Sequence, residues 1–155
     1  MHMQNSEDSL KAFEKYPPEL QEIIAAAEDG KGEDWKFIDE RLPNIVKHES
    51  AIRWARKEGI GHKTNENFRD LAASMFELYE GHLTADDHHH LKNVMERDHK
   101  KPAGFRAACA LLKHGERVVQ VKAKQVLERF SHHNDPVISR HAQELLAQKT
   151  EKKEG

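Results

Sequence analysis

Histidines are the residues of this sequence that most readily suggest chemistry, because 12 of its 155 residues are histidine. Three of them stand in a row at positions 88–90, and His82 and Asp86 lie just before them. Side chains of consecutive helical residues point about 100° apart, so three in a row cannot bind one ion, whereas Asp86 and His90 share a face. Without a cysteine or a second ligand pair nearby, this set is too small for a structural zinc site. We therefore predict a solvated, partly protonatable helix face and no metal ligand.

Cys109 is the one cysteine of the sequence and so its one candidate thiol nucleophile. It lies between two alanines on a segment with helical apolar spacing, where a thiol is expected to be buried and unreactive. His114 follows five residues later, on the far side of the same expected helix. The sequence also lacks a glycine-rich phosphate loop, a Gly-x-Ser-x-Gly elbow and a His-Glu-x-x-His motif. We therefore predict a protein without catalytic residues, cofactor or metal.

The elements that position these residues are expected to be helices throughout, because no segment alternates apolar and polar residues for long enough to form a strand. Trp35 and Trp54 occupy or adjoin apolar positions and are expected to pack in the core or between helices; the alternative for Trp54, flanked by Arg53 and Arg56, is that it lines a partner surface. We expect a break or sharp kink at Pro43. Apolar spacing, caps and Gly or Pro stops predict helices over about 5–16, 19–29, 35–43, 45–59, 65–80, 85–100, 102–114, 116–131 and 136–149.

Composition favours one soluble helical domain, since hydrophobic residues make up 37% and charged residues 34% of the chain. No apolar run approaches the roughly 20 residues that cross a bilayer, and the N-terminus lacks the order of a signal peptide. A single cysteine agrees with a reducing compartment. We expect a cytoplasmic protein without membrane contact, with one helical-repeat domain over residues 1–149 and a charged flexible tail over 150–155.

Two segments of the C-terminal half carry proline, arginine, alanine and leucine in the same register, 34 positions apart. They are Pro102-Ala-Gly-Phe-Arg-Ala-Ala-Cys-Ala-Leu-Leu112 and Pro136-Val-Ile-Ser-Arg-His-Ala-Gln-Glu-Leu-Leu146. A third segment, Asn67-Phe-Arg-Asp-Leu-Ala-Ala73, matches residues 104–110 at an offset of 37 but lacks the proline. The chain therefore contains a helical repeat, clearest over residues 65–148.

The segment from Asp135 to Leu146 resembles the second-helix signature of HEAT repeats, in which Asp-Pro, a β-branched residue, Arg and Ala recur. Repeats of 34 and 37 residues are shorter than the roughly 40–47 of that family, and Gly104 stands at a β-branched position. The resemblance implies an all-α fold of stacked antiparallel helical hairpins, an α-solenoid. An irregular α-helical bundle is the alternative.

The resemblance also bears on single residues. In HEAT proteins the repeated arginine commonly bridges neighbouring repeats, which implies a structural role for Arg69, Arg106 and Arg140. Some HEAT proteins are metal-dependent hydroxylases that use several His-Glu pairs, but His48-Glu49 is the one such pair in this sequence. One pair cannot build a site for two metal ions, so the resemblance does not extend to that activity.

The chain is unevenly charged although its formal net charge is only −2. Residues 1–50 carry 12 acidic and 6 basic residues, whereas residues 100–133 carry 8 basic and 2 acidic residues. Such polarity suits head-to-tail packing, an acidic partner or nucleic acid.

The basic segment supplies the predicted binding residues. On the helix expected over 116–131, the apolar stripe centres on Val119, Val126 and Phe130. Spacing directs two basic side chains away from this stripe and two to its flank. The predicted partner-binding residues are accordingly Arg117 and Lys124, which point away, and Lys122 and Arg129, on the flank.

The leading functional hypothesis is a non-enzymatic protein-interaction module or scaffold that binds a protein partner, or another copy, along its exposed helix faces. The alternative is binding of a nucleic-acid backbone through the basic segment 100–133, without sequence readout because no aromatic or amide side chains are interleaved. A metalloenzyme built around His82, Asp86 and His90 is the least favoured of the three.

Overall fold

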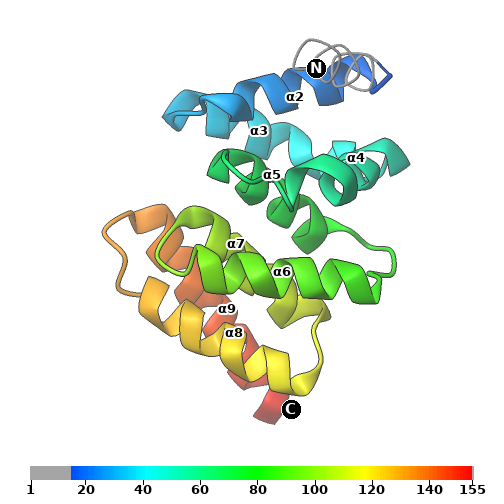
Figure 1. The fold of residues 1–155 in the computed structure, drawn as a ribbon. Helices are drawn as coiled ribbons and strands as arrows, with labels where there is room; N and C mark the ends of the chain where they lie inside the picture. Colours follow the sequence, from blue (N-terminus) through cyan, green and yellow to red (C-terminus); the bar gives the residue numbers. More distant parts are fainter. Residues whose placement is uncertain (1–14, 155) are drawn as a thin grey trace.

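The structure, a computed structural model, describes residues 15–154, with side chains up to Gln148, and this part is helical with no strand (Figure 1). The all-α prediction is confirmed. The helix expected over 5–16 falls almost entirely outside the described residues. None of the described helices is both long and apolar enough to cross a bilayer. The elements are α2 (Pro18–Glu28), α3 (Gly32–Ile45), α4 (Glu49–Trp54), the π-helical segment η1 (Ala55–Gly59), α5 (Glu66–Leu78), α6 (Ala85–Arg97), α7 (Pro102–His114), α8 (Arg117–Phe130) and α9 (Pro136–Glu154).

Several helix ends follow from signals in the sequence. Asn65 caps α5, and its side chain accepts a hydrogen bond from the backbone N–H of Asn67 at 2.9 Å. Thr84 and Asp87 form a reciprocal capping box at the start of α6, as their spacing predicts. Pro102 opens α7 at a position where its missing N–H removes no intrahelical bond.

Two expected boundaries differ from the structure. Helix α3 continues through Pro43 to Ile45, so the break predicted at the proline falls later, at Val46–His48. Pro43 has no N–H to donate to the carbonyl four residues earlier, but only two helical residues follow it, and the buried side chain of Ile45 favours completing the last turn. Helix α9 keeps helical backbone to Glu154, through most of the segment 150–155; the flexibility of that segment stays a prediction.

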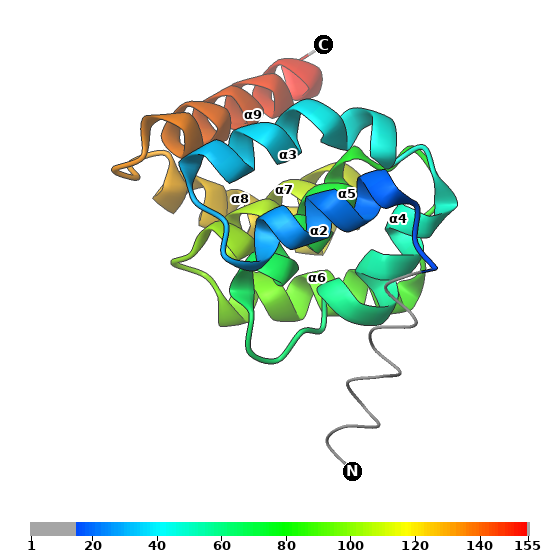
Figure 2. The same ribbon diagram turned by 90° about the horizontal axis from the view of Figure 1, so that it is seen from above.

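Helix α7 is the centre of the fold. It packs against α5, α6 and α8, and nine of its 13 residues are buried. Figure 1 shows the helices in successive layers, from α2 at the top to α8 and α9 at the bottom. In the view of Figure 2, α3 and α9 lie along one side of the molecule, α4 and α6 along the other, and α5 and α7 between them. The predicted core position of Trp54 is confirmed, because its side chain is buried.

Two arginines hold α6 at its two ends. Near the start of the helix, Arg56 of η1 donates from Nε and Nη2 to the carboxylate of Asp87, at 2.9–3.1 Å. At its end, Arg69 of α5 donates from Nε and Nη2 to Asp98, at 2.8 and 3.2 Å, and both side chains are buried. Charge-assisted pairs of this fork geometry fix orientation as well as distance. They therefore set how α6 lies on the preceding helices.

Gly104 allows the closest approach between α6 and α7. A Cβ added at this position would clash with the backbone carbonyl of Asp98, the C-cap residue of α6. The first turn of α7 therefore passes directly over the end of α6, and the glycine is required by packing rather than by an unusual backbone angle.

We expect Gly104→Ala to destabilise the fold by about 3 kcal/mol, because the clash lies on backbone that cannot rotate away. This is opposite in sign to the gain of about 1 kcal/mol that alanine normally gives a helix over glycine. The matched control is Gly32→Ala at the start of α3, where nothing lies within 4 Å of an added Cβ. Urea unfolding followed by circular dichroism measures both, and a Gly104→Ala protein as stable as the control would contradict the close contact.

Candidate functional site

The predicted binding residues lie on α8, and the structure places three of the four at the surface. Arg117, Lys122 and Arg129 are exposed. Lys124, which spacing directs away from the core, is half-buried instead. The predicted inward stripe is largely confirmed, since Val126 and Phe130 are buried and Val119 is partly buried against the core.

Two valines that the sequence reading did not single out lie among these basic residues. Val118 is 73% exposed and Val121 is 53% exposed. They stand three positions apart on α8 and therefore on neighbouring turns of one side of the helix. We call the surface formed by Arg117, Val118, Val121, Lys122 and Arg129 the outer face of α8. It combines exposed apolar and basic side chains.

A groove of about 640 Å³ lies on another part of the molecule, between α3, α5, α7 and the start of α9. Trp35 lines this groove and is half-buried, so its position is less enclosed than the core packing expected for it. The groove is lined by both apolar and charged side chains, among them Trp35, Asp39, Asp70, Ser74, Arg106 and Ile138. Apolar walls and a charged floor of this kind are typical of ligand or peptide grooves.

Asp70 and Arg106 form the charged floor of the groove. The Arg106 Nε lies 3.9 Å from the Asp70 Oδ1, and this oxygen is buried without a hydrogen-bond partner. Burial raises the pKa of Asp70 to about 7; Arg106 opposes the rise, and the nearby carboxylates of Asp39 and Glu66 add to it. The Asp70 carboxyl therefore changes charge near neutral pH, where an ordinary aspartate is fully ionised.

The repeated arginines are placed differently from one another. Arg69 is paired with Asp98, as described above. Arg106 reaches from α7 to two carboxylates of α5, those of Asp70 and Glu77, each at 3.9 Å. Arg140 is exposed on α9. The first two thus link neighbouring helices, whereas the third lies at the surface.

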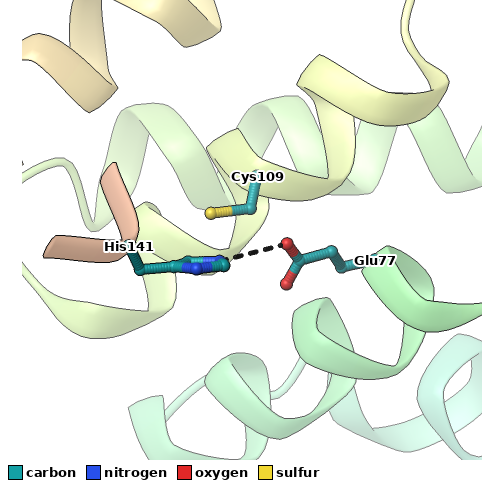
Figure 3. Close-up of side chains that lie close together, drawn as sticks. All are labelled: Glu77, Cys109 and His141. Carbon is teal, nitrogen blue, oxygen red and sulfur yellow. Dashed lines mark ion pairs between the residues drawn. The ribbon is translucent and has the colours of Figure 1, made fainter. Parts of the chain in front are cut away.

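Glu77, Cys109 and His141 meet beside this arginine, one from each of α5, α7 and α9 (Figure 3). One ligand atom from each side chain lies within 4.8 Å of the other two. The Nε2 of His141 is 3.5 Å from Glu77 Oε2. Figure 3 shows the Cys109 sulfur above the imidazole ring and the carboxylate beyond the ring's edge.

Cys109 is buried, as predicted, but its thiol is not remote from a base, because His141 lies beside it. Burial raises the pKa of this thiol well above its usual value, and the charge of Glu77 adds to the rise. A protonated thiol that is 2% exposed is a poor nucleophile. The cluster is therefore better suited to coordination than to covalent catalysis.

His82, Asp86 and His90 do not form such a cluster. His82 and Asp86 are exposed and His90 is half-buried on α6. Among the side chains that the structure describes, the three potential ligands that converge are Glu77, Cys109 and His141. These stand at a constant separation of 32 residues, which is close to the repeat length. The sequence analysis did not identify this set, and the even spacing is the one sequence signal that it carries.

Comparison of the chain with protein-family models, with curated protein sequences and with solved structures finds no match. Function is therefore inferred from the chemistry and geometry of its own residues.

The raised pKa of Asp70 predicts a pH dependence of stability. Between about pH 4 and pH 7 the folded chain keeps a proton on Asp70 that the unfolded chain has released, so the free energy of unfolding falls as pH rises. A shift from 3.8 to about 7 corresponds to roughly 4 kcal/mol, fully present below pH 3.8 and lost above about pH 7.

Asp70→Asn removes this contribution, because the amide does not titrate. We expect its urea-unfolding free energy to fall much less than that of the wild type between about pH 4 and pH 8. Asp39 retains a slope of the same sign, since burial raises its pKa too. The exposed Asp86→Asn is the control and keeps the wild-type slope. Parallel curves for Asp70→Asn and the wild type would show that Asp70 is ionised throughout.

Proposed function

We propose that the protein is a non-enzymatic protein-interaction module, built as a HEAT-like α-solenoid, whose outer face of α8 binds an acidic segment of a partner protein. The order of helix contacts supports the solenoid: α5 packs on α7, α6 on α7, α7 on α8 and α8 on α9. Contacts between elements close in the chain are what a repeat array requires. The repeated register of Arg106 and Arg140 agrees with it.

The observation that carries the proposal is the exposure of Val118 and Val121. No described helix packs on the outer face of α8, and helix faces open to solvent are normally polar. Two valines at 73% and 53% exposure contradict that expectation. Apolar side chains grouped on an open helix face favour a surface that another protein covers.

The chemistry of the partner follows from the residues around the valines. Arg117, Lys122 and Arg129 are exposed beside them, in a segment that carries eight bases and two acids over residues 100–133. An apolar centre with a charged rim is the usual arrangement of protein interfaces. The best match is an amphipathic helix with apolar residues on one stripe and acidic residues at its edges. A phosphate backbone would bind the basic side chains alone, and the valines would contribute nothing to that binding.

The test compares capture by three immobilised proteins: wild type, the apolar variant Val118→Ser with Val121→Ser, and the basic variant Lys122→Glu with Arg129→Glu. Proteins that the wild type captures and both variants lose are purified, and their dissociation constants for the wild type and each variant are measured by calorimetry. We expect each double substitution to weaken binding by at least about tenfold. The apolar variant removes the apolar centre of the interface, and the basic variant removes its charged rim.

Matched controls lie elsewhere on the chain: Val137→Ser, an equally exposed valine of α9, and Lys57→Glu, an exposed lysine of η1. Both should bind like the wild type. Partners that bind all variants equally would exclude the outer face of α8 as the interface. A labelled DNA duplex that binds at low salt, and that the basic variant loses while the apolar variant keeps, would replace this proposal with backbone binding.

A further inference from the structure

We propose that Glu77, Cys109 and His141 form a binding site for a zinc ion, which joins α5, α7 and α9. The three side chains supply oxygen, sulfur and nitrogen, the ligand set that zinc accepts in proteins. They come from three different helices and converge although they are far apart in sequence. Nothing in the outer face of α8 depends on this site.

The distances fit one tetrahedral ion. Zinc–ligand bonds of about 2.0–2.3 Å place two ligands of the same ion about 3.3–3.6 Å apart. The Nε2 of His141 and the Oε2 of Glu77 are already 3.5 Å apart. The Cys109 sulfur lies within 4.8 Å of one imidazole nitrogen of His141 and one carboxylate oxygen of Glu77, so a movement of about 1 Å completes the set. Three protein ligands leave the fourth position to water or an anion.

The state of His141 is a second, independent indication. Its Nε2 is buried, and it has no hydrogen-bond partner among the described residues. At 3.5 Å the Glu77 carboxylate is an ion-pair neighbour of this nitrogen and not a hydrogen-bond partner, so its hydrogen-bonding capacity stays unmet. The ring makes an edge-on contact with Phe105, at 5.6 Å between centroids, and its nitrogen faces the Glu77 carboxylate. A metal ion would satisfy the nitrogen.

The surrounding charges also fit. Arg106 lies 3.9 Å from the Oε1 of Glu77, which leaves the other oxygen, Oε2, directed at His141. The Glu77 carboxylate and a Cys109 thiolate would together neutralise a divalent ion. Outer contacts that orient a ligating carboxylate in this way are a regular part of metal sites.

Binding must displace the thiol proton, so zinc affinity should rise with pH. The groups that face the Cys109 sulfur are Glu77 and Asp70 from α5, Arg106 from α7 and His141 from α9. Burial and, after it, the charge of Glu77 hold the proton on the thiol, and Arg106 opposes them. Zinc competes directly with that proton.

The test uses the full chain, without an affinity tag of histidines. Zinc is titrated against a chromophoric chelator to give stoichiometry and affinity, and Co²⁺ is added separately as a spectroscopic probe. We expect one equivalent of zinc to bind, with Co²⁺ giving the visible bands of a tetrahedral site and a near-ultraviolet thiolate charge-transfer band. Cys109→Ser and His141→Gln should weaken zinc binding by more than about tenfold.

The control addresses the surface histidines, which bind metals weakly on their own. The triple variant His88→Gln, His89→Gln, His90→Gln keeps the proposed site and should bind zinc like the wild type. Circular dichroism confirms that each variant is folded; if a ligand variant is not, the Co²⁺ spectrum of the wild type still decides. Absence of the thiolate band, or zinc binding that the triple variant loses and Cys109→Ser keeps, would overturn the proposal.

Discussion

The buried pair between Arg69 and Asp98 is the interaction on which the middle of the molecule depends. Asp98 ends α6, receives two hydrogen bonds from Arg69 of α5, and presents its carbonyl to Gly104 of α7. Its carbonyl also accepts from the backbone N–H of Lys101, which sets the turn into α7. Three helices are therefore fixed relative to one another at one residue. Removing one partner of such a buried pair typically costs about 3–5 kcal/mol, because the remaining charge has no compensation.

The rest of the polar interior follows from the register that this junction imposes on α5 and α7. With the two helices fixed, Asp70 and Glu77 of α5 lie at opposite sides of the Arg106 guanidinium, each 3.9 Å away. One arginine thus connects the floor of the groove to the cluster of Cys109 and His141. A change of charge at one carboxylate alters how strongly the other is held, since both share the same cation in a region of low dielectric.

How much of this was predictable depends on the range of the interaction. Asn65, the Thr84–Asp87 capping box and Pro102 act within one turn, so the sequence alone placed three helix starts correctly. The helix break was predicted at Pro43, too early, because a long-range contact, the burial of Ile45, overrode the local signal.

The groove and the Glu77–Cys109–His141 cluster could not be derived from the sequence, because their members come from different helices and meet only when the packing angles are known. The half-buried position of Lys124 has the same origin: a helical wheel gives direction but not what a neighbouring helix covers.

Helix α9 has a position that bears on how the molecule would open. It packs chiefly against α8, yet it supplies one wall of the groove and the imidazole of His141. A helix that packs chiefly against one neighbour exchanges with a locally unfolded state at lower free energy than the centre of a fold. Detachment of this one helix would expose Cys109 and remove one wall of the groove, while α5, α6 and α7 would stay packed together. The rate at which a small alkylating reagent modifies the Cys109 thiol would therefore report how often α9 detaches.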